Sequence, residues 1–225
     1  MITLSFTEEN YLKSIYTLQH RSEAGEVSVN EIAERMHTKP ATVTDMLRKL
    51  SEKELIHYEK YKKIQLSESG ILHALQILRK HRLWETFLHD KLRFSWDEVH
   101  EVAEQLEHIH SEQLIERLDE FLGFPTYDPH GDPIPNVAGE IPPSSAQLLK
   151  DAPMDVSCKI VAVKDTSPAF LQQLERFGLQ IGVTVVVTEH MPFDNSLMIE
   201  AAKNSFLISE KISENILVLL VKGRK

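Results

Sequence analysis

Residues 28–50 read Ser-Val-Asn-Glu-Ile-Ala-Glu-Arg-Met-His-Thr-Lys-Pro-Ala-Thr-Val-Thr-Asp-Met-Leu-Arg-Lys-Leu, and they predict two short helices joined by a tight turn. Ser28 and Glu31 stand at the spacing of a capping box, which starts a helix by pairing the two side chains with free backbone N–H groups. Pro40 suits the first position of the second helix, where its missing N–H costs nothing. Apolar residues at helical spacing follow Pro40, as expected for the buried face of a helix.

The segments around this pair complete a DNA-reading unit. A helix is expected from Thr7 to about His20, and two strand-like runs at 56–59 and 64–66 flank a lysine-rich turn. This order is that of a winged helix-turn-helix, whose second helix enters the major groove. The candidate DNA-binding residues on that helix and wing are Thr38, Lys39, Ala41, Thr42, Thr44, Asp45, Arg48, Lys49, Lys60, Lys62 and Lys63.

The charge pattern supports DNA binding only in this region. The chain has 225 residues with 34 acidic and 25 basic side chains, a formal charge of −9, which excludes a protein that coats nucleic acid generally. Residues 39–63 reverse the sign locally, with more lysine and arginine than acidic residues.

Cys158 is the single cysteine, so an internal disulfide and a multi-cysteine metal site are excluded. The N-terminus lacks a signal-peptide pattern and no apolar run is long enough for a membrane helix, so we expect a cytoplasmic protein.

An acidic, histidine-rich region follows the wing. A long helix is expected after Ser67, and a second one from the Ser95–Glu98 capping motif to about Leu122. On that second helix His100, Glu104, Glu107 and His108 share one face over two turns, while His81 and Glu85 form an i, i+4 pair on the preceding helix. Imidazole and carboxylate side chains from facing helices are typical ligands of a divalent transition metal, and without thiolates the set favours Mn(II) or Fe(II), although Zn(II), Co(II) and Ni(II) remain open.

The C-terminal third has a different character. Seven of the ten prolines lie between Pro125 and Pro153, which indicates an extended connector. Beyond it, five short β-type runs and a single helical run at 168–177 predict a small barrel.

These motifs, in this order, resemble the diphtheria-toxin-repressor and manganese-transport-regulator family of metal-dependent transcriptional regulators. The resemblance is carried by residues 7–16, 32–35, 40–44, 80–85, 99–108 and 130–135. It implies a mainly α protein with a small β domain: a winged helix-turn-helix at 1–70, a helical dimerisation and metal-binding domain at 71–124, a Pro-rich linker at 125–153 and an SH3-like domain at 154–225 like that of ferrous-iron-transport accessory proteins. The implied protein is a homodimer that binds a palindromic double-stranded DNA operator and represses metal-uptake genes when activated by Mn(II) or Fe(II).

The resemblance also implies the metal ligands. Asn10, Glu104, Glu107 and His108 would form a primary site, and His81, Glu85 and His100 an ancillary site. Glu104 replaces the cysteine of iron-responsive members, which favours Mn(II). Lys13 stands where two-manganese members have a second N-terminal carboxylate, which argues against a binuclear arrangement. The residues expected in the dimer seam are Trp84, Phe87, Leu88, Leu114, Leu118 and Phe121.

Two rival functions follow from the same residues. A di-metal enzyme would need ligands on every helix of a four-helix bundle and an accompanying nucleophile or general base, and neither pattern is present. A winged-helix regulator of an organic ligand would share residues 28–66 but would not need Glu104, Glu107 and His108 together. We therefore predict a metal-dependent DNA-binding regulator and no enzymatic activity, with an Fe(II)-responsive repressor as the alternative to an Mn(II)-responsive one.

Overall fold

The computed structural model describes residues 3–22, 25–58, 63–202 and 204–221. The chain divides into two compact units. The first comprises Met1–His81, Gln105–Glu112 and Pro135–Ile141, and the second comprises Arg82–Glu104, Gln113–Ile134 and Pro142–Lys225. The expected Lys60 and Lys62 of the wing lie outside the described residues.

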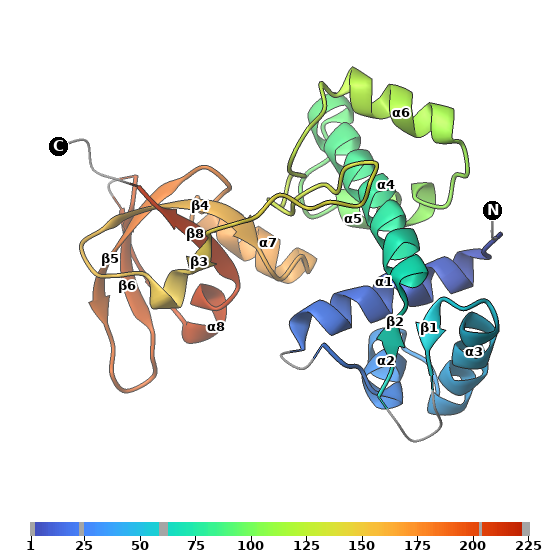
Figure 1. Cartoon of the computed structure of the whole chain (residues 1–225). Helices are drawn as coiled ribbons and strands as arrows, with labels where there is room; N and C mark the ends of the chain where they lie inside the picture. Colours follow the sequence, from blue (N-terminus) through green and yellow to red (C-terminus); the bar gives the residue numbers. More distant parts are fainter. Residues whose placement is uncertain (1–2, 23–24, 59–62, 203, 222–225) are drawn as a thin grey trace. The chain divides into compact units, whose positions relative to one another are not determined.

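The first unit contains the predicted winged helix-turn-helix. Helices α1 (Phe6–Arg21), α2 (Val29–Arg35) and α3 (Pro40–Glu52) are followed by strands β1 (Ile56–His57) and β2 (Gln65–Leu66), which pair antiparallel (Figure 1). The predicted capping box is confirmed: Ser28 and Glu31 each accept from the other's backbone N–H and so fix the start of α2. Pro40 is the first residue of α3, as expected.

One apolar core holds together the winged helix-turn-helix of α1 to β2, which is called the DNA-reading head below. Leu12 and Ile15 of α1, Leu47 and Leu50 of α3, and Ile64 before β2 are fully buried and belong to the same cluster. Leu75 and Leu78, in the first half of α4 (Glu68–Leu92), join that cluster. The three head helices are therefore packed on the beginning of the long helix rather than carried as separate segments.

The prediction of one long helix from the Ser95–Glu98 capping motif to about Leu122 is wrong, because the structure has two helices there. Helix α5 covers Val99–Leu106 and α6 covers Glu112–Phe121. The Ile109 N–H donates to Leu106 O at 3.1 Å, a tighter turn that ends α5. Consequently Glu107 and His108 do not continue the helical face of His100 and Glu104 but lie in the turn beyond it. Periodicity missed the break because the two buried side chains at 107 and 108 continue an apparent helical pattern.

The second unit contains a six-stranded antiparallel sheet in the order β3-β8-β4-β5-β6-β7. The strands are β3 (Gln147–Leu148), β4 (Ser157–Val163), β5 (Thr184–His190), β6 (Leu197–Ala201), β7 (Asn204–Ile208) and β8 (Ile216–Leu220). A 3-10 helix (Leu149–Asp151), α7 (Pro168–Arg176) and α8 (Glu210–Ser213) accompany them. The five predicted strands are confirmed, and β3 adds a sixth inside the proline-rich stretch.

A loop after α6 packs directly on this sheet. Val163 of β4 donates its N–H to His130 O at 3.0 Å. The next residue, Gly131, has a φ of +84°, and a Cβ placed there would lie 1.9 Å from Val161 O. Only glycine allows this approach of two backbones. Trp96, which precedes α5, is buried in the core of the sheet domain beside this loop.

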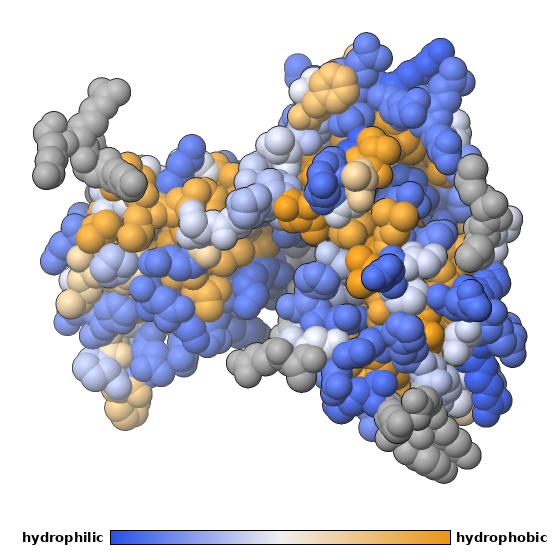
Figure 2. Space-filling view, viewed as in Figure 1, coloured by the Kyte–Doolittle hydropathy of each residue, from blue (hydrophilic) through white to orange (hydrophobic). Residues whose placement is uncertain are grey.

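On the face seen in Figure 2, hydrophilic residues predominate, and hydrophobic ones gather over parts of the sheet domain and of the helices. Of the described helices, none combines the length and the hydrophobicity that crossing a bilayer requires.

Candidate metal centres and DNA interface

Helix α3 presents its polar residues to solvent beside the buried stripe of Val43, Leu47 and Leu50. Seven of the predicted DNA-binding side chains are exposed and two are half-buried: Lys39, Ala41, Thr42, Asp45, Arg48, Lys49 and Lys63 are exposed, and Thr38 and Thr44 are half-buried. Arg48 Nη1 lies 3.3 Å from Asp45 Oδ1 one turn earlier. The helix therefore offers small side chains at its N-terminal end and cations further along, the pattern that suits base edges and phosphates respectively.

Glu107 is the centre of a buried polar cluster in the first unit. Its side chain is fully buried, Lys13 Nζ of α1 donates to both of its carboxylate oxygens at 2.6 and 2.8 Å, and His81 Nδ1 of α4 lies 2.6 Å from Oε2. Burial by itself would raise the pKa of Glu107, but the His81 hydrogen bond and the Lys13 charge outweigh it and hold that pKa below its ordinary value. Glu107 is therefore an ionised carboxylate, the form that binds cations.

His108 is oriented by α1 from the opposite side of this cluster. Its Nδ1 lies 2.5 Å from Glu9 Oε2, and its ring stacks on Phe6 with centroids 4.6 Å apart. Its Nε2 lies 3.9 Å from Glu107 Oε1. A histidine that binds a metal through one ring nitrogen commonly donates the other N–H to a carboxylate. Glu9 stands in that position, and the sequence reasoning missed it.

Asn10, next along α1, carries the clearest sign of an absent partner. Its Oδ1 is buried and, among the described residues, no group donates a hydrogen bond to it. An unpaired buried oxygen costs free energy unless another group satisfies it. An amide oxygen, a carboxylate and two imidazoles (Asn10, Glu107, His108 and His81) form a donor set that fits a divalent ion with oxygen and nitrogen preference.

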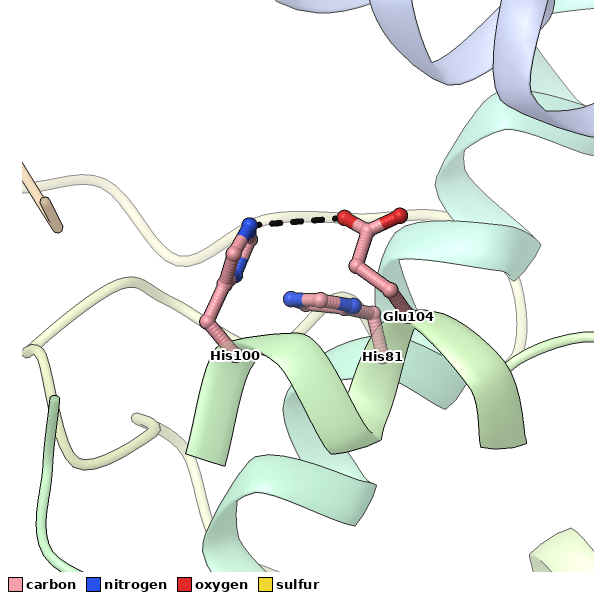
Figure 3. A group of neighbouring side chains, drawn as sticks. All are labelled: His81, His100 and Glu104. Atoms are coloured by element: carbon pink, nitrogen blue, oxygen red, sulfur yellow. Dashed lines mark ion pairs between the residues drawn. The ribbon is translucent and has the colours of Figure 1, made fainter. Parts of the chain in front are cut away.

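The residues expected in the ancillary site are in part together in the second unit. His100 Nδ1 lies 3.1 Å from Glu85 Oε1 of α4. Its Nε2 lies 3.4 Å from Glu104 Oε1, one turn along α5, the pair joined by the dashed line in Figure 3, which also draws His81. Glu85 is buried, whereas the His100 side chain is 46% exposed. Glu104, predicted for the primary site, is thus paired with a residue predicted for the ancillary one.

Glu85 also belongs to a second buried group that sequence reasoning missed. One ligand atom from each of Glu85, Asp128 and His130 lies within 4.8 Å of the other two, and all three residues are buried. Burial opposes the charge of His130, but the hydrogen bond and charge of Glu85 raise its pKa to about 9. Burial, with the charges of Glu85 and Asp132, raises the pKa of Asp128 well above its ordinary range. The motif at 130–135 was the only sequence signal for this group, and its spacing did not point to Glu85.

The expected dimer residues differ in exposure. Trp84, Leu88 and Leu118 are buried within the chain, whereas Leu114 is 39% and Phe121 63% exposed. Phe87 links the two sets, with its ring 5.8 Å from that of Trp84 and 6.1 Å from that of Phe121. The three buried residues support the helices from inside, and Phe121 and Leu114 are partly exposed at the surface.

Three family models match consecutive parts of the chain. Residues 3–64 match the iron-dependent repressor N-terminal DNA-binding domain, residues 67–136 match the iron-dependent repressor metal-binding and dimerisation domain, and residues 147–220 match the FeoA domain.

Curated relatives and solved structures agree with these matches. The chain is 30% identical over 191 residues to the diphtheria toxin repressor of Corynebacterium glutamicum, covering 80% of this chain and 82% of that protein. It is 36% identical over 132 residues to the iron-dependent repressor IdeR of Mycobacterium tuberculosis, and there the match spans little more than half of the relative, 56%. A manganese-dependent transcriptional repressor in complex with manganese superposes with a TM-score of 0.87 at 32% identity, covering 95% of this chain and all of the other. The manganese regulator SloR gives 0.78 at 32% identity, covering 95% and 98%.

A winged helix, helices rich in metal-ligand side chains and an SH3-like domain together define a metal-dependent DNA-binding repressor. This chain belongs to the diphtheria-toxin-repressor family of iron- and manganese-dependent transcriptional repressors, whose members are DNA-binding proteins and not enzymes. The family's first two domains serve DNA binding, metal binding and dimerisation. The predicted family and fold class are confirmed.

Proposed function

We propose that this protein is a cytoplasmic homodimeric repressor of metal-uptake genes that binds a palindromic operator when Mn(II) is bound. The observation that carries the proposal is the meeting of α1 and the α5–α6 turn around Glu107. Asn10 and Glu9 belong to the helix that packs in the DNA-reading head, and Glu107 and His108 belong to the metal-binding region of the family. A ligand held by both segments would couple metal occupancy to the placement of the head.

The ligand assignment follows from the chemistry of each group. Asn10, Glu107, His108 and His81 would hold the ion of the first unit, with Glu9 orienting His108. When bound, a divalent cation would supply a positive charge that these oxygen and nitrogen donors can coordinate. The hard oxygen donors favour Mn(II), with Fe(II) as the alternative.

We propose a further metal-binding group in the second unit. Glu85, Asp128 and His130 are buried together, with His100 at Glu85 and Glu104 at His100. Two carboxylates and an imidazole are donors that suit a divalent cation, which would compete there with the charges of His130 and Arg82. The number of ions bound per chain therefore depends on whether both groups are occupied.

The DNA and dimer surfaces are assigned on exposure. The exposed and half-buried residues of α3 listed above, with Lys63, would contact DNA, while Lys60 and Lys62 extend the same lysine-rich wing by sequence. The dimer seam would centre on Leu114 and Phe121, supported by Trp84, Phe87, Leu88 and Leu118. The domain boundaries remain as proposed from the sequence: 1–70, 71–124, 125–153 and 154–225.

The deciding experiment is a DNA-binding titration by fluorescence anisotropy on the promoter region of the protein's own gene. It is run with chelator, with Mn(II) and with anaerobic Fe(II) at fixed salt. The wild type should bind only with metal, and Glu107→Ala should lose that response. Glu112→Ala, an exposed glutamate at the start of α6, is the matched control and should behave as wild type. Binding unaffected by chelator would instead indicate a regulator of an organic ligand.

A further inference from the structure

The polar cluster of the first unit already contains its own cations. The two buried carboxylates, Glu107 and Glu9, are each met by a lysine: Lys13 Nζ lies 2.6 Å from Glu107 Oε1, and Lys80 Nζ lies 3.8 Å from Glu9 Oε1. The side chains of Lys13 and Lys80 are only 11% and 14% exposed. Lysines this deeply placed are uncommon unless they are paired. The described structure therefore has its carboxylate charge compensated from within the chain.

Lys13 is the one of the two that competes for a proposed ligand. It contacts both carboxylate oxygens of Glu107, and His81 approaches one of the same oxygens. A lysine ammonium that already holds a carboxylate oxygen opposes the binding of a divalent ion to that oxygen, because two positive charges at that distance repel. The Lys80 ammonium is more than 1 Å further from its carboxylate and leaves Glu9 directed to His108.

We propose that Lys13 is an internal counter-ion of Glu107 that an incoming divalent ion must displace, so that Lys13 sets the metal affinity of this site. The inference rests on the proposed function, since it assumes that Glu107 binds metal. In the metal-free protein Lys13 holds α1 to the α5–α6 turn by an ion pair. On metal binding the Glu107 oxygens change partner, and the Lys13 side chain leaves them.

The test is Mn(II) binding to the full chain, measured by isothermal titration calorimetry at fixed pH and salt, together with the thermal midpoint of the metal-free protein. Lys13→Met keeps an unbranched side chain and removes the charge. It should bind Mn(II) at least about tenfold more tightly than the wild type. Its metal-free midpoint should be lower, because Glu107 is left buried without its counter-ion, and Mn(II) should raise that midpoint more than it does in the wild type.

The matched control is Lys53→Met. Lys53 pairs with Glu8 of the same helix α1 at 2.8 Å, but it is 33% exposed and touches no proposed ligand. Its metal affinity should equal that of the wild type. A second variant, Lys13→Arg, keeps the cation and can hold the carboxylate through two N–H groups. It should bind Mn(II) no more tightly than the wild type. If Lys13→Met does not fold, this comparison of Lys13→Arg with the wild type tests the counter-ion role.

The outcomes separate the two proposals. A wild type that binds no Mn(II) overturns the proposed function. A wild type that binds Mn(II), with Lys13→Met binding equally or more weakly, overturns the counter-ion role alone. Tighter binding by Lys13→Arg than by the wild type overturns it as well.

Discussion

His108 Nδ1 lies 2.5 Å from Glu9 Oε2 across 99 residues of sequence. This contact joins the helix that packs in the DNA-reading head to the turn that follows α5. It also fixes which ring nitrogen of His108 remains for a metal, because Nδ1 is engaged and Nε2 is the atom directed toward Glu107. With His108 as the proposed ligand, this contact gives Glu9 the role of an orienting residue rather than that of a ligand.

Glu9→Gln should weaken Mn(II) binding by about 10–100-fold, the usual cost of losing the carboxylate behind a metal-binding histidine. The affinity is measured by calorimetric titration. Its neighbour Glu8 is the control: it caps α1 through Ser5 and pairs with Lys53, so Glu8→Gln should lower the thermal midpoint but leave the metal affinity unchanged. Equal affinities in Glu9→Gln and the wild type would remove the orienting role.

Asn10→Leu should separate metal binding from stability. The substitution removes an unpaired buried oxygen, so the metal-free protein should be as stable as the wild type or more stable. Its stabilisation by Mn(II) should be smaller, because one oxygen donor is gone. Thermal midpoints with and without Mn(II) measure both effects, and a full metal-induced shift in Asn10→Leu would show that Asn10 is not a ligand.

The capping box of α2 should contribute to the pH dependence of stability. Hydrogen bonds from the Ser28 side chain and backbone hold the pKa of Glu31 below its ordinary value. A carboxyl with a lowered folded-state pKa stabilises the fold above its unfolded value of 4.5, and that contribution disappears as the pH falls through the folded pKa. The free energy of unfolding, measured with urea, should therefore fall less between about pH 7 and about pH 3 in Glu31→Gln than in the wild type. Ser28→Ala should cost about 1 kcal/mol near neutral pH.

Phe121→Glu should convert the dimer to a monomer without unfolding the chain, because the Phe121 side chain is 63% exposed and its ring neighbours are Phe87 and Lys91 of α4. Light scattering measures the mass in solution. Phe193→Glu is the control, since Phe193 is fully exposed on the turn between β5 and β6 and belongs to no proposed interface. A Phe121→Glu protein that keeps the dimer mass would place the seam elsewhere.

Local sequence determined the elements whose signals are short-range. The Ser28–Glu31 box, Pro40 and the alternation of apolar residues fixed the head helices and five strands, because caps, proline geometry and periodicity act within a few residues. The order of motifs was enough to predict the family and most of the proposed metal ligands.

Only the tertiary structure decided where the helix after Trp96 ends and which side chains meet at that point. The end of α5 at Leu106 follows from burying Glu107 and His108 against His81 and Glu9, partners 26 and 99 residues away. The Glu85, Asp128 and His130 group and the Lys13–Glu107 pair arise in the same way. A buried charge takes whichever partner the packed fold brings near it, and long-range packing leaves no periodic trace in the sequence.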